Sequence, residues 1–204
     1  MTVNLSGYSP LLPTSLTLLE RLQQNPSAAD WERVCLLYEQ LISRWAHRAL
    51  GSRDGVSDIA QEVMVAVIRD IPKFEHRGAG SFRGWLRGIT VNRLHEFYRA
   101  RRRNPIPSPV ADETDDFLAR LADPVDALTA QWDREHDQWV FAKLCALIEP
   151  DFAPATWRAF RMVTLEDQRA VDVAAETGLT VNAVLLAKSR ILKRLREEAG
   201  VFLE

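Results

Sequence analysis

Residues 58–103 read DIAQEVMVAVIRDIPKFEHRGAGSFRGWLRGITVNRLHEFYRARRR and fall into three segments of different character. The first, 58–67, mixes acidic and apolar residues and is expected to form a helix. A loop with two glycines follows at 74–82, and a basic, aromatic helix is expected to run to about Arg102. From Arg69 to Arg103 the chain carries ten Lys or Arg against three Asp or Glu. Cations interleaved with rings favour nucleic acid as a ligand, because cations bind phosphates and rings stack on exposed bases.

The ends of these helices and of the preceding one can be placed from local signals. Ser57 or Asp58 is expected to cap the first helix, and Ser81 is expected to cap the basic helix. Upstream, apolar residues spaced by three and four predict an amphipathic helix beginning at Asp30; they are Trp31, Val34, Leu37, Tyr38, Leu41, Ile42 and Trp45. Residues 1–27 contain three prolines and are interpreted as a loose N-terminal arm with one short helix at 16–22.

The chain changes character after the basic helix. Residues 104–135 hold eight acidic residues and two Arg, and four prolines interrupt regular helix up to residue 124. This composition predicts a flexible acidic linker with one short helix near 117–121. The linker carboxylates Asp112, Glu113, Asp115 and Asp116 are candidates for a catalytic or metal site, but carboxylates need rigid placement for such a role, so catalysis has little support.

The helical pattern returns from about Ala127, and residues 170–184 predict a helix, a tight turn and a second helix. Gly178 is expected in the left-handed conformation, Leu179 in the core and Thr180 at the helix cap. The second helix continues to about Glu198 and carries five cations: Lys188, Arg190, Lys193, Arg194 and Arg196. An ordinary helical hairpin would have the same spacing, but the cations favour a DNA-binding helix-turn-helix.

These segments predict an all-α fold with two small helical domains, at 28–103 and 136–204, joined by the linker. No apolar run reaches the roughly 18 residues that a membrane span requires. The N-terminus lacks the pattern of a secretory signal, and Cys35 and Cys145 are expected to be reduced core thiols, which favours the cytoplasm. No spacing of His and Cys indicates a metal site, and no cofactor is expected.

Several side chains of the basic helix have two interpretations. Its rings at Phe82, Trp85 and Phe97 are individually more typical of a core than of base stacking, whereas Tyr98 beside Arg99 is a better surface candidate. Asn92 is either a solvated side chain or an amide that reads a base edge. The arginine run could simply complement the dipole at the end of the helix.

This layout resembles the extracytoplasmic-function (ECF) sigma factors of bacterial RNA polymerase, which have two helical domains joined by a flexible linker. Residues 58–64, DIAQEVM, look like the family's Asp-x-x-Gln-Glu-x-Phe segment. Residues 74–86, ending in SFRGWL, are similar to its Phe-Arg-Gly-x-Ser-Phe-x-x-Trp-Leu segment. Val91-Asn92 and the following arginine run continue the match.

The resemblance implies that Asp58, Gln61 and Glu62 bind core polymerase at its clamp helices. The loop 75–81, together with the basic helix, would capture flipped-out bases of the minus-ten element, since stacking and edge hydrogen bonds can offset the cost of flipping. The implied minus-ten contacts are His76, Arg77, Ser81, Trp85, Asn92, Arg93, Tyr98, Arg99, Arg101 and Arg102. The implied minus-thirty-five contacts are Thr180, Asn182, Lys188, Ser189, Arg190 and Arg194.

Together these features predict a sigma factor that binds core polymerase and promoter DNA and is not itself an enzyme; by analogy, an anti-sigma factor is a further candidate partner. The chain departs from the family in its second helix, where Leu185-Leu186-Ala187 precedes Lys188-Ser189-Arg190 and displaces these cations by three residues, or about 300° of helix rotation. An unusual minus-thirty-five preference is therefore expected. The alternatives are a stand-alone helix-turn-helix regulator and a nucleic-acid-modifying enzyme with a metal site in the linker.

Overall fold

The computed structural model describes residues 17–102 and 111–199, and every regular element in these two ranges is helical. The predicted all-α fold is therefore confirmed. The α-helices are α1 (Leu18–Gln24), α2 (Ala28–Leu50), α3 (Val56–Asp70), α4 (Ser81–Arg102), α5 (Ala111–Ala122), α6 (Ala127–Ile148), α7 (Pro154–Thr164), α8 (Ala170–Thr177) and α9 (Val181–Ala199). Short 3-10 turns at Ile71–Lys73 and Glu149–Asp151 follow α3 and α6.

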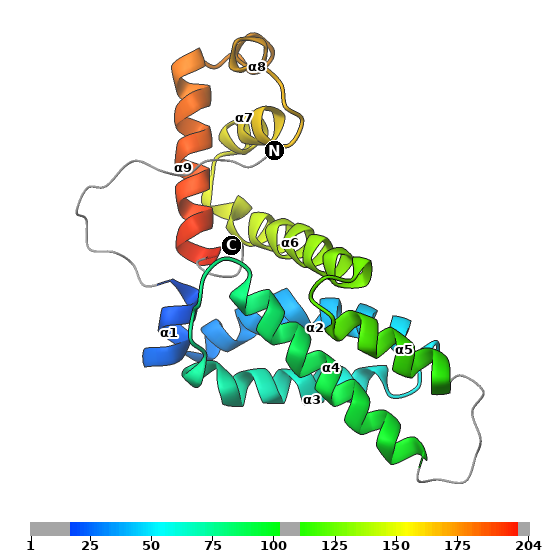
Figure 1. Ribbon diagram of the computed structural model, residues 1–204. Coiled ribbons are helices and arrows are strands. Elements are labelled where there is room, and N and C mark those ends of the chain that lie inside the picture. The colour runs from blue at the N-terminus through cyan, green and yellow to red at the C-terminus, as the bar shows by residue number, and fades with distance from the viewer. Residues whose placement is uncertain (1–16, 103–110, 200–204) are drawn as a thin grey trace.

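Helices α1 to α5 form a bundle, α7 to α9 form a second unit, and α6 runs between them (Figure 1). The bundle exists because α2, α3 and α4 each carry one apolar stripe, and burying all three requires that they pack on one another. Ser27 and Asp30 form a capping box that starts α2, and Gly51 ends it in the left-handed conformation. The short helix predicted in the N-terminal arm is present as α1, with Leu18, Leu19 and Leu22 buried against the bundle.

Two predicted caps are wrong. Helix α3 begins at Val56, so Ser57 and Asp58 lie inside its first turn rather than before it. The reason is Gly55, which precedes the helix and turns the chain with a φ of +78°. Glycine also has no Cβ, and a Cβ at this position would lie only 2.4 Å from the ring of Phe97. Ser81 is the first residue of α4, and its Oγ accepts a hydrogen bond from the N–H of Arg77 instead of capping the helix.

The predicted linker, 104–135, is helical over most of the part that the structure describes, although the return of helix at about Ala127 is as expected. Residues 111–122 form α5, which is longer than the helix expected at 117–121, and α6 follows from Ala127. Leu118 and Leu121 are fully buried, and α5 packs on α2, α4 and α6. Apolar residues spaced three apart give α5 an apolar face, and burying that face stabilises the fold. A solvated linker would lack this stabilisation. Residues 103–110 lie outside the described ranges.

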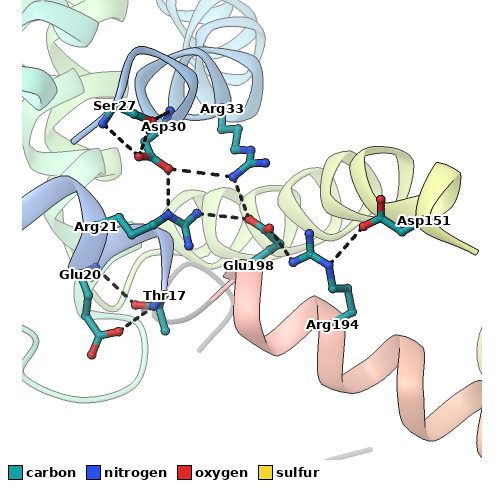
Figure 2. A network of polar contacts seen from close by, with 9 residues as sticks. All are labelled: Thr17, Glu20, Arg21, Ser27, Asp30, Arg33, Asp151, Arg194 and Glu198. Atoms are coloured by element: carbon teal, nitrogen blue, oxygen red, sulfur yellow. Dashed lines mark hydrogen bonds and ion pairs between the residues drawn. The ribbon is translucent and has the colours of Figure 1, made fainter. Parts of the chain in front are cut away.

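The two units are also joined by charged side chains that lie far apart in the sequence (Figure 2). The buried carboxylate of Glu198 on α9 lies 3.5 Å from the guanidinium of Arg21, 3.6 Å from that of Arg33 and 2.6 Å from that of Arg194. Arg21 in turn donates to Asp30 at 2.8 Å, and Arg194 also pairs with Asp151 at 3.2 Å. This network places the end of α9 against α1 and α2.

In the described ranges no single helix is long and apolar enough to cross a membrane. Helices α8 and α9 together have the required length and composition, but the chain bends by 106° between them. Cys35 and Cys145 are both free thiols. Burial raises the pKa of the Cys145 thiol to about 11, so it is protonated near neutral pH.

Candidate nucleic-acid interface

The loop before α4 is held in shape by a small set of polar contacts. Ser81 Oγ lies 3.1 Å from Nδ1 of His76 and accepts from the backbone N–H of Arg77 at 3.3 Å. The Arg77 guanidinium pairs with Glu75 at 3.0 Å, but both side chains remain at least three-quarters exposed. His76 is exposed as well. The backbone is therefore ordered while the ring of His76 and the cation of Arg77 face solvent, where a ligand can reach them.

A hollow of about 440 Å³ lies beside this loop, next to the half-buried ring of Trp85. Trp85 is fixed by two neighbouring rings, because its centroid is 5.1 Å from that of Phe74 and 5.3 Å from that of Phe82. The hollow is lined by Lys73, Phe74, Glu75, Arg77, Ser81 and Trp85. An aromatic ring, a hydroxyl and two cations around one hollow can bind an unstacked base and its phosphate, and the Glu75 carboxylate, which also lines the hollow, is paired with Arg77.

Farther along α4, some of the predicted contact residues are exposed and others are paired with side chains of the protein itself. Asn92, Arg99 and Arg101 are exposed, and the Arg101 guanidinium lies over the Phe97 ring at 5.5 Å. Arg93 is half-buried and pairs with Glu96. Arg102 lies in the last turn of α4, and its side chain is outside the described set.

Tyr98 faces inward, although the sequence favoured it as a surface ring. Its hydroxyl donates to the carbonyl of Ala49 at 3.0 Å and accepts from the Thr114 hydroxyl at 3.1 Å. This side chain therefore connects α4 to the end of α2 and to α5, and no local sequence pattern indicates these distant partners.

The residues predicted to bind polymerase share one exposed face of α3. Asp58, Gln61 and Glu62 are exposed and line a shallow hollow of about 460 Å³ that Arg93 of α4 closes. Val65 continues this face and leaves 64% of its surface exposed. Two carboxylates and two arginines, Arg69 and Arg93, around an exposed apolar side chain are suited to a protein partner with charges of both signs.

The sequence missed two cations that serve the fold rather than a ligand. Arg83 of α4 reaches Asp137 of α6 at 3.0 Å, and Arg87 reaches Asp133 at 2.9 Å. These pairs neutralise the side of α4 that faces α6. The net positive charge of α4 is therefore concentrated on its other side and its end.

Helices α8 and α9 have the geometry of a helix-turn-helix. Their axes bend by 106°, within the 90–120° typical of that motif, across a three-residue turn. Gly178 has a φ of +72° and the Thr180 hydroxyl accepts from the N–H of Ala183, so both predictions for the turn are confirmed. Leu179 packs against the small core of this unit, as expected.

The predicted contacts on α9 do not all face the same way. Thr180, Asn182, Ser189 and Arg190 are exposed. Lys188, by contrast, is half-buried. Arg194 holds Asp151 and Glu198 in ion pairs, so in this arrangement its cation serves the tertiary structure.

A metal-dependent alternative receives no geometric support from the described residues, among which no group of three or more His, Cys, Asp or Glu side chains could hold a metal ion. Asp115 is half-buried and Asp116 exposed on α5, and the side chains of Asp112 and Glu113 lie outside the described set.

Part of this chain is similar to known protein families. Residues 36–104 match the sigma-70 region 2 family, a range that includes α3, the loop and α4. The chain is 30% identical over 122 residues to an ECF RNA polymerase sigma-E factor of Haemophilus influenzae, covering 57% of this chain and 56% of that protein. It is 26% identical over 170 residues to the ECF RNA polymerase sigma factor SigD of Mycobacterium tuberculosis, covering 78% and 71%.

A further relative is the ECF RNA polymerase sigma factor SigE of Mycolicibacterium smegmatis, which is 25% identical over 91 residues, or 45% of this chain. The chain spans 34% of that relative's length and, as above, about half of the Haemophilus protein.

Proposed function

We propose that the chain is an ECF sigma factor that binds core RNA polymerase in the cytoplasm, recognises two promoter elements and helps to open the duplex between them. The observation that carries this proposal is the match of residues 36–104 to sigma-70 region 2. That range holds both the acidic face of α3 and the aromatic hollow before α4, which are the two surfaces that such a role requires. No catalytic residue is assigned.

Polymerase binding is assigned to Asp58, Gln61 and Glu62. Their exposure on one face of α3, beside Val65, supports a protein interface with a polar rim and an apolar centre. Replacing all three residues with Ala should weaken binding to core polymerase at least tenfold, which corresponds to about 1.4 kcal/mol. Glu32→Ala, an exposed carboxylate on α2, is the matched control and should bind normally.

Capture of minus-ten bases is assigned to the hollow beside Trp85 together with His76, Arg77, Ser81 and Asn92. The exposed amide of Asn92 supports base-edge recognition, because an amide can both donate and accept. Exposed Arg99 and Arg101, with Arg93 and Arg102 on the same helix, would neutralise the flanking phosphates. Tyr98 would act by positioning the end of α4.

The proposal is tested with purified core polymerase and a promoter library. We expect stable binding and initiation from a restricted set of promoters, with open complexes detected by reactivity of unpaired thymines to permanganate. Asn92→Ala should reduce open-complex formation about tenfold and leave polymerase binding unchanged, whereas Gln138→Ala, an exposed amide on α6, should change neither.

Two results would redirect the assignment. Equal loss of polymerase binding and melting in Asn92→Ala would make Asn92 a structural residue. Failure of the wild-type chain to bind core polymerase, with tight binding to duplex DNA instead, would favour a stand-alone helix-turn-helix regulator.

A further inference from the structure

Helix α9 exposes apolar side chains where a soluble helix normally carries polar ones. Leu185 and Leu186 leave 50% and 44% of their surfaces exposed, in the first two turns of the helix. The opposite face carries Val184, Ala187 and Ile191, all buried. The two leucines therefore point away from the core of their own unit, and burying them against a partner would stabilise the complex.

The exposed leucines belong to a continuous stripe. Asn182, Leu185, Leu186 and Ser189 are all exposed and are spaced at i, i+3, i+4 and i+7, which places them on one face of a helix. The stripe (these four residues) contains no charged side chain. It presents one amide, two branched apolar side chains and one hydroxyl in order along the helix.

The surroundings of the stripe are cationic. Between residues 181 and 196 the sequence has five Lys or Arg and no Asp or Glu. Arg190, Lys193 and Arg196 are exposed, and Lys193 makes only a long contact of 3.9 Å with Glu197. A cationic rim fits a polyanion, and the 106° bend from α8 frees the start of α9 to enter a groove.

The major groove of DNA meets both requirements. It is flanked by phosphates, and thymine presents a C5-methyl group there that apolar side chains contact. Helix-turn-helix proteins read base edges with the N-terminal residues of the second helix, which is where the stripe lies. An acidic protein segment would also meet a cationic rim, but it would not explain the amide and hydroxyl that bracket the leucines along a base-reading helix.

We propose that Leu185 and Leu186 select thymines in the upstream promoter element by contacting their methyl groups, and that Asn182 reads a neighbouring adenine. This inference rests on the proposed function and specifies what the minus-thirty-five reader recognises. The proposed contacts also account for the displaced Lys188-Ser189-Arg190 segment. Leucines occupy the exposed positions 185 and 186, and Arg190, one turn later, would face the phosphates.

The test removes single methyl groups from the DNA. The upstream element is first identified from the promoter library, and each of its thymines is then replaced by deoxyuridine, which lacks only the methyl group. Binding of the polymerase holoenzyme and initiation should fall roughly fourfold for each contacted methyl, since one buried methyl is worth about 0.8 kcal/mol. The double variant L185A/L186A should bind thymine and deoxyuridine templates equally well.

The matched control is Leu165→Ala, which removes a leucine of similar exposure, 51%, at the end of α7. It should retain full discrimination between thymine and deoxyuridine. All variants remove exposed side chains, and unchanged thermal unfolding would establish that they fold.

Several outcomes would overturn the inference alone. Promoter-selective initiation that is insensitive to deoxyuridine, or a sensitivity that L185A/L186A leaves intact, would show that the leucines do not read methyl groups; the stripe would then be a protein-docking surface. Absence of polymerase-dependent initiation by the wild-type chain would instead overturn the proposed function.

Discussion

The bundle of α1 to α5 shares one large core with α6 and with parts of α7 and α9, whereas the helix-turn-helix also has a separate, small core of its own. The larger core contains fully buried aromatic side chains, among them Tyr38, Trp45, Phe82 and Trp132. The small core of the helix-turn-helix consists of Ala159, Met162, Val173, Ala174 and Val184. Stabilisation by burial grows with apolar area, so the second unit gains much less from its own core.

Helix α9 shows how the smaller unit compensates. Its C-terminal half places Ile191 and Leu195 in the larger core and Glu198 in the charged network, while its N-terminal half carries the exposed stripe. One end of the helix is therefore anchored and the other is exposed to solvent. The exposed stripe therefore depends on the rest of the chain for its support.

The largest expected effect comes from emptying the two cores. Phe82 packs against the rings of Tyr38, Phe74 and Trp85 at centroid distances of 5.3–5.5 Å. Phe82→Ala should lower the free energy of unfolding by about 3–5 kcal/mol, whereas Val184→Ala should cost about 2 kcal/mol. Urea denaturation measures both. Equal costs would mean that the two cores do not differ as described.

The charged network should show the next effect. Glu198→Gln leaves the guanidinium groups around it without their shared carboxylate and should cost about 1–3 kcal/mol. Because Arg21 lies 177 residues away in sequence, a double-mutant cycle between Arg21→Ala and Glu198→Gln isolates their interaction, expected at about 1 kcal/mol. Strict additivity would indicate that α9 does not rest on the bundle in solution.

Acid should weaken the same junction. Burial alone would raise the pKa of Asp30, but hydrogen bonds from Ser27 and Arg21 outweigh it and lower that pKa from 3.8 to about 2. Stability from this group is therefore fully present above about pH 4 and is lost as pH falls toward 2, by roughly 2 kcal/mol. Unfolding measured from pH 2 to 5 should show this loss in the wild type and a smaller one in Asp30→Asn.

The smallest effect is expected at the turn of the helix-turn-helix. Gly178 is left-handed, but a Cβ there would meet nothing within 4 Å, so Gly178→Ala should cost only about 1 kcal/mol of backbone strain. Gly55→Ala in the bundle should cost more, because its Cβ would also clash with Phe97. Thermal unfolding of the two variants, compared side by side, would show similar costs if Phe97 can move aside freely.

The sequence alone determined the helical class, the span of α4 and the turn at Gly178, because each depends on spacing and residue types within a few positions. It also indicated a nucleic-acid ligand, since cations and rings are concentrated in one stretch of the chain. It misplaced the caps of α3 and α4 because the preceding backbone, not the hydroxyl or carboxyl nearest the apolar run, sets where each helix begins.

Tertiary structure decided which of several similar side chains are available to a ligand. In sequence, Arg190 and Arg194 are equivalent cations on one helix, yet only Arg194 meets Asp151 and Glu198. Tyr98 faces inward because Ala49 and Thr114 lie beside it, and α5 is packed because α2 and α4 cover its leucines. Apart from Glu198, which is four residues from Arg194, these side-chain partners lie 16 to 49 residues apart, so their contacts leave no local pattern and exist only once the chain has folded.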